Sequence, residues 1–141
     1  MSMNTALVFP MAALVLVTFL VSLVTFRVRI KAVRTGEIKL SYFKTFREQG
    51  TIPEDVLKTQ RHLTNLFELP VLFYAACLAG LVITVHAPLL VLFAWIFVGA
   101  RVVHAWIHIG SNSIRPRMAS FVVGWLALIA MWVNLVIVAS V

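Results

Sequence analysis

The chain has 141 residues, of which 62% are hydrophobic and only 12% are charged. Soluble domains carry about 25% charged residues, so this composition excludes an ordinary soluble domain. The formal net charge of +7 does not indicate a nucleic-acid partner either, because nine of the twelve Lys and Arg residues fall between Arg27 and Arg61, between two apolar segments. A basic cluster beside a membrane span indicates anionic lipid headgroups as its counter-charge.

Four apolar segments with short connections occupy almost the whole chain. The sequence therefore predicts an all-α integral membrane protein, with residues 1–141 forming one four-helix transmembrane domain. The expected helices cover residues 5–32, 53–85, 89–109 and 115–139.

The first apolar segment is long enough to cross a bilayer. Leu7 to Phe26 spans 20 uncharged residues, which is longer than the core of a secretory signal, and no basic residue precedes it. We expect a retained helix whose end is marked by Arg and Lys residues.

The second helix is expected to begin with a capping box, in which Thr51 and Glu54 bond to backbone amides on either side of Pro53. Its roughly 33 residues exceed what the hydrocarbon core requires, so its first turns should project past the bilayer. His62, in those turns, and His86, in the next loop, are expected to be solvated.

The first and third loops carry the cationic residues. By the positive-inside rule both loops should face the cytoplasm, with both termini on the other side of the membrane. We expect the membrane to be a bacterial inner membrane.

Ionisable residues inside apolar helices are costly, and by default they mark function. In the second helix Arg61, Asn65 and Glu68 have offsets 0, +4 and +7. At about 100° per residue, these offsets place the three side chains on one helix face.

The third and fourth helices repeat this pattern at the same membrane side. Arg101, His104 and His108 have offsets 0, +3 and +7, and Arg115 and Arg117 open the fourth helix. The excess of cations predicts an anionic ligand, and Arg side chains suit carboxylates in particular. An alternative for part of the set is internal pairing of Glu68 with one of the arginines.

These spacings resemble the MAPEG family, the membrane-associated proteins in eicosanoid and glutathione metabolism. The second-helix pattern is Arg-x-x-x-Asn-x-x-Glu followed by proline, and the third-helix pattern is Arg-x-x-His. The residues that carry the resemblance are Arg27, Arg61, Asn65, Glu68, Pro70, Arg101, His104 and Arg117.

The resemblance implies a homotrimer that binds glutathione, as a co-substrate, between adjacent subunits near the cytoplasmic face. Arg117 would stabilise the thiolate, since a nearby cation lowers the pKa of a thiol. The sulfur would then attack a lipophilic electrophile or reduce a hydroperoxide. The residues implied to bind glutathione are Arg27, Arg61, Asn65, Glu68, Arg101 and His104.

One departure from the family concerns the chemistry directly. Several members carry a tyrosine one turn beyond the third-helix histidine, where this chain has His108. A histidine can donate a hydrogen bond to a thiolate or act as a base, so His108 is predicted to be catalytic together with Arg117. Met118, which follows Arg117 where some members carry a serine, is a second departure, and together they are typical of a bacterial-type branch.

Two other functions remain as alternatives. A non-catalytic scaffold of the same fold would bind lipids or a protein partner, and the missing tyrosine favours it. His104 and His108 also have metal-ligand spacing, and Glu68 could complete a zinc or iron site. Arg101 and Arg117 disfavour a dication there, so we expect no metal.

Overall fold

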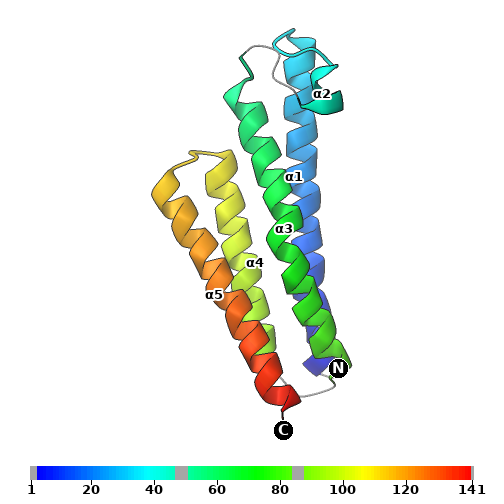
Figure 1. Cartoon of the computed structure of the whole chain (residues 1–141), viewed down its shortest axis with the longest axis vertical. Helices are drawn as coiled ribbons and strands as arrows, with labels where there is room; N and C mark the ends of the chain where they lie inside the picture. The colour runs from blue at the N-terminus through cyan, green and yellow to red at the C-terminus, as the bar shows by residue number, and fades with distance from the viewer. Residues whose placement is uncertain (1–2, 47–50, 84–87, 141) are drawn as a thin grey trace.

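The computed structural model describes residues 3–46, 51–83 and 88–140. In these segments four helices are long and apolar enough to cross a membrane. The predicted all-α, four-helix membrane bundle is confirmed. The elements in chain order (Figure 1) are η1 Met3–Leu7, α1 Val8–Arg34, α2 Tyr42–Thr45, α3 Glu54–Val82, α4 Pro88–Ile109 and α5 Ile114–Ala139.

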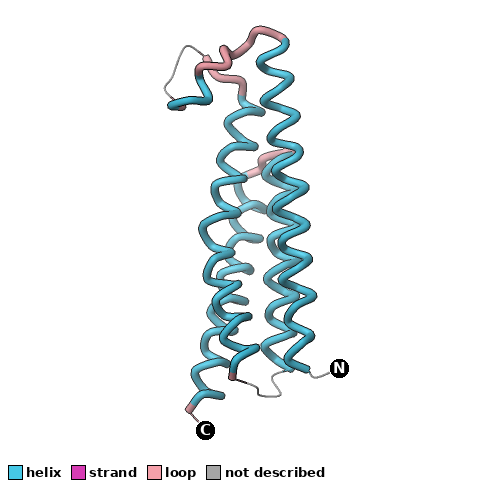
Figure 2. Tube along the Cα trace, turned by 90° about the vertical axis from the view of Figure 1, so that its right-hand side faces the viewer, coloured by secondary structure: helices cyan, strands magenta, loops and turns pink. Residues whose placement is uncertain are grey.

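The bundle consists of two helical hairpins. α1 and α3 form one and α4 and α5 the other, and α4 also contacts α1 and α3. The α1–α3 connection and the α4–α5 turn lie at the same end of the bundle, and both chain ends lie at the other (Figures 1 and 2). At the loop end, α1 and α3 extend beyond the α4–α5 turn.

Helix ends differ from the predicted ones where local geometry intervenes. A 3-10 turn over Met3–Leu7 precedes α1, which then continues two residues past the predicted end, to Arg34. The predicted capping box is wrong, because Pro53 is the N-cap of α3 and no side chain hydrogen-bonds there. Residue 85, the predicted end of the second helix, lies outside the described residues.

An apolar core holds the hairpins together. The rings of Phe73 on α3 and Phe97 on α4 stack with centroids 4.7 Å apart. Leu14, Leu90 and Met131 pack into the same cluster and are fully buried. The outer surface is apolar as well, with large exposed side chains such as Phe19, Val71, Trp106 and Val136. In a bilayer that surface faces lipid or a neighbouring subunit.

Candidate functional site

A polar pocket of about 280 Å³ lies where the first turns of α3 rise beside the α4–α5 turn. It combines three of the predicted site residues with groups from the start of α3 and the turn. The residues that line it are Glu54, Leu57, Lys58, Arg61, His108, Asn112 and Arg117.

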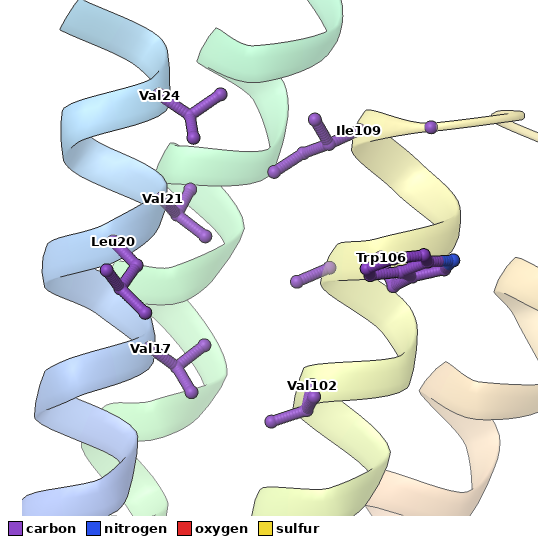
Figure 3. A pocket seen from close by; sticks show the side chains of 9 residues that line it. Val17, Leu20, Val21, Val24, Val102, Trp106 and Ile109 are labelled. Atoms are coloured by element: carbon purple, nitrogen blue, oxygen red, sulfur yellow. The ribbon is translucent and has the colours of Figure 1, made fainter.

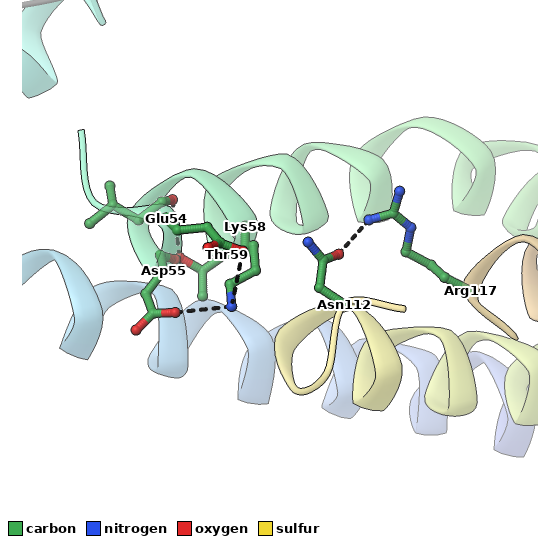
Figure 4. A network of polar contacts seen from close by, with 7 residues as sticks. Glu54, Asp55, Lys58, Thr59, Asn112 and Arg117 are labelled. Carbon is green, nitrogen blue, oxygen red and sulfur yellow. Dashed lines mark hydrogen bonds and ion pairs between the residues drawn. The ribbon is translucent and has the colours of Figure 1, made fainter. Parts of the chain in front are cut away.

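Arg117 is fixed in this pocket by the turn that precedes its helix. Its guanidinium donates a hydrogen bond to the side-chain oxygen of Asn112 (Figure 4). Asn112 has a left-handed backbone, with φ of +52°, and its backbone N–H donates a hydrogen bond of 2.7 Å to the Ile107 carbonyl. Asparagine tolerates this conformation better than most residues. The turn therefore both ends α4 and positions the arginine.

Two arginines at the pocket are not neutralised by a described carboxylate and can bind an anionic ligand. Lys58 forms ion pairs within its own helix: its Nζ atom lies 3.1 Å from Oδ1 of Asp55 and 3.7 Å from Oε1 of Glu54 (Figure 4). In the described part of the chain, neither Arg61 nor Arg117 has a carboxylate partner. The pocket therefore presents two guanidinium groups that no described carboxylate neutralises, and such a pocket suits an anion. Lys58 and Asn112 were not anticipated there, since neither stands in an apolar stretch.

Below the pocket, Arg101 is fully buried. Its guanidinium donates hydrogen bonds to the side chain of Asn65 and, at 3.3 Å, to the Asn65 carbonyl. It also lies 5.8 Å from the ring centroid of Phe121 on α5. Arg101 and Asn65 thus join α3 to α4, and within the described chain Glu68 pairs with neither Arg61 nor Arg101.

Three histidines meet between α3 and α4. The ring centroids of His62 and His104 are 5.5 Å apart, those of His62 and His108 5.0 Å, and those of His104 and His108 5.6 Å. The expectation that His62 is solvated is wrong, because its side chain is fully buried. His86 lies outside the described residues.

The position of His62 was indicated by helical periodicity. His62 precedes the buried Leu66 by four residues and the buried Leu69 by seven, so all three share the inner stripe of α3. The distance of His62 from the helix start predicts exposure to solvent, but its place in this stripe puts it at the centre of the polar cluster.

Two predicted site residues lie apart from the others in the single chain. Arg27 is exposed and borders a groove on the outer side of α1, with Lys31 and Arg34. Glu68 is exposed and makes no ion pair with any described residue. One subunit therefore gathers most, but not all, of the predicted site.

An apolar groove of about 580 Å³ runs between α1 and α4. Val17, Leu20 and Val24 of α1 face Val102 and Trp106 of α4 across it (Figure 3). Its end near the loops is formed by Ile109 and Gly110, directly after His108. The groove can bind a hydrocarbon chain, but it offers nothing for a charged tripeptide.

The sequence model of the MAPEG family matches residues 7–137, which is nearly the whole chain. The chain belongs to the MAPEG family. No curated protein and no solved structure matches it. As a MAPEG protein with four spanning helices, it is an integral membrane protein of a family concerned with glutathione and eicosanoid metabolism.

Proposed function

We propose that this MAPEG protein is a glutathione-dependent transferase or peroxidase that acts on lipophilic electrophiles or hydroperoxides in the membrane. The observation that carries the proposal is a pair of guanidinium groups in the polar pocket beside His108, those of Arg61 and Arg117, which have no carboxylate partner among the described residues. The carboxylates and thiolate of glutathione are the anions that such a pocket suits.

The roles follow from the chemistry of each group. Arg61 binds a glutathione carboxylate, which stays charged throughout the reaction. Arg117 stabilises the negative charge on sulfur, because a guanidinium remains protonated and needs no proton transfer to do so. His108 donates a hydrogen bond to the thiolate in place of the family tyrosine. The lipophilic substrate lies in the groove between α1 and α4.

We propose further that the active unit is a homotrimer with its loops in the cytoplasm of a bacterium. Glu68 supports an assembly, because it lies about 21 Å along α3 from Val82, at a depth where hydrocarbon surrounds the helix. An exposed carboxylate at that depth needs a polar partner. In the trimer, Arg27 and Glu68 complete the glutathione site at the subunit interface.

Calorimetric titration of the detergent-solubilised protein with glutathione tests the proposal. We expect saturable binding, and turnover with chlorodinitrobenzene or cumene hydroperoxide when glutathione is present. Ophthalmic acid, which lacks the thiol, should bind but not react. Absence of glutathione binding would favour the second candidate, a lipid- or partner-binding scaffold, which the missing tyrosine supports.

A further inference from the structure

The three clustered histidines are not explained by glutathione chemistry alone. His62 is fully buried, and neither of its ring nitrogens has a hydrogen-bond partner among the described residues. The Nδ1 atom of His108 is also buried without a described partner. Buried polar nitrogens normally have a partner, and leaving one without costs about 1–3 kcal/mol in general. Each neutral imidazole has one lone pair and one N–H, so the cluster can offer one nitrogen per ring to a ligand that accepts lone pairs.

His104 is already oriented as a metal ligand would be. Its Nδ1 lies 3.1 Å from the Arg117 carbonyl oxygen and 3.3 Å from the Ser120 hydroxyl. A carbonyl oxygen only accepts, so Nδ1 carries the proton and Nε2 has the free lone pair. Metal-binding histidines usually donate their second N–H to such a backbone carbonyl, which fixes the ring.

The spacing of the rings fits one metal ion. One nitrogen from each of His62, His104 and His108 lies within 4.8 Å of the other two. Tetrahedral coordination with metal–nitrogen bonds of about 2.0–2.1 Å places such nitrogens about 3.3 Å apart. Small rotations of the three histidine side chains would bring the nitrogens from within 4.8 Å of one another to this tetrahedral spacing.

We propose that His62, His104 and His108 bind a transition-metal ion of the Zn²⁺ type, with a fourth coordination position open to the polar pocket. Imidazole ligands suit zinc, copper, iron and nickel. The ion lies at the base of the pocket, because His108 contributes both to the cluster and to the pocket wall.

The surrounding cations determine what fills the fourth position. Lys58, Arg61 and Arg117 line the pocket, and Arg101 is buried one helix turn before His104. A dication bound by three neutral imidazoles adds to this positive charge. An anionic fourth ligand, such as chloride, hydroxide or a thiolate, offsets it. The site should therefore bind the metal together with an anion.

The metal site and the proposed role of His108 are compatible. An imidazole that binds a metal through one nitrogen keeps a proton on the other. Metal binding to the cluster thus keeps a hydrogen-bond donor on His108 for an anion in the pocket. The metal proposal is tested without glutathione, so it stands or falls independently of the transferase activity.

The test uses the full chain without a histidine tag, solubilised in detergent and stripped with EDTA. After addition of Zn²⁺ and dialysis, elemental analysis should find about one zinc per chain. Co²⁺ should give the intense visible absorption of tetrahedral coordination. Addition of mercaptoethanol should then produce a sulfur-to-cobalt charge-transfer band, since a thiolate can take the open position.

His62→Phe separates metal binding from folding. It removes one ligand and two buried nitrogens that have no partner in the described part of the chain, so the metal-free variant should melt at or above the temperature of the parent. Zn²⁺ should raise the melting temperature of the parent but not that of the variant, whose zinc affinity should fall more than about tenfold. His86→Ala, which changes the fourth histidine of the sequence, is the matched control and should bind zinc like the parent.

Three results would overturn the proposal. The first is a zinc content far below one per chain, and the second is an unchanged cobalt spectrum in His62→Phe. The third is an equal loss of zinc in His86→Ala and His62→Phe, which would indicate nonspecific binding. If the cobalt spectrum does not change when mercaptoethanol is added, the ion has no open fourth position.

Discussion

The buried guanidinium of Arg101 on α4 is hydrogen-bonded to both the side chain and the backbone carbonyl of Asn65 on α3. This contact joins the two hairpins beneath the polar pocket. Only Nη2 of Arg101 makes these bonds, since its Nε and Nη1 atoms are buried without a partner among the described residues, so the Asn65 contact matters more for this buried charge. Asn65 therefore has a structural role within one subunit, whatever it contributes to ligand binding.

Asn65→Leu should destabilise the protein by about 2–4 kcal/mol, because it leaves the Arg101 charge buried without its side-chain partner. Thermal denaturation in detergent measures the effect. Asn134→Leu is the matched control, since the buried Oδ1 of Asn134 has no described partner and its loss should cost little. Equal stability of the two variants would contradict the structural role of Asn65.

Arg117→Ala and Arg61→Ala should separate chemistry from binding. Arg117→Ala should abolish turnover while weakening glutathione binding only modestly. Arg61→Ala should weaken binding about 10–100-fold, the loss expected for a charge-assisted hydrogen bond of about 1.5–3 kcal/mol. Calorimetry measures the binding, and thiolate absorbance of the bound glutathione measures the activation. If Arg61→Ala abolished turnover and Arg117→Ala mainly weakened binding, Arg61 would be the residue that stabilises the thiolate.

Asn112→Gly should reduce turnover without preventing folding. Glycine readily adopts the positive φ that Asn112 has, so the turn is retained while Arg117 loses its partner. We expect turnover between those of the parent and Arg117→Ala, and a melting temperature close to the parent value. Parent-like turnover would show that Asn112 does not position Arg117.

Glu68→Leu should dissociate the proposed trimer, because we place the Glu68 carboxylate against a polar group of a neighbouring subunit. Native mass spectrometry in mild detergent gives the oligomeric state. Phe67→Leu, which changes an adjacent exposed residue, is the control. If Glu68 instead faces lipid alone, Glu68→Leu should stabilise the chain and leave its oligomeric state unchanged.

Gly80→Ala should destabilise the bundle by about 1–3 kcal/mol through overpacking. A Cβ atom at Gly80 would collide with the Leu90 side chain and approach the Leu7 Cδ1 atom to 2.9 Å, and both leucines are buried. Gly99→Ala should instead be neutral or stabilising by up to about 1 kcal/mol, because no described atom lies within 4 Å of the added Cβ. Thermal denaturation compares the two.

Helix number and the main polar residues could be predicted because both follow from local sequence. Continuous apolar segments define the spans, and Arg61, His108 and Arg117 stand out near their ends. Arg27 and Glu68 do not line the pocket of the single chain, and their place in an assembly cannot be read from one sequence.

What sequence reasoning missed depended on packing between helices. The burial of His62 required knowing that α4 presents His104 and His108 opposite it. The bond between Asn112 and Arg117 required the left-handed backbone of the α4–α5 turn. Neither can be read from spacing within one helix.

The end of α4 separates two environments that adjoin each other in the sequence. His108 borders the polar pocket, whereas Ile109 and Gly110 border the apolar groove. A water-soluble molecule can reach the first from the aqueous phase, and a hydrocarbon can reach the second by lateral diffusion in the bilayer. For a reaction across this boundary, the rate should follow the mole fraction of lipophilic substrate in the membrane. Dilution with inert lipid should therefore slow turnover even when the bulk concentration of that substrate is constant.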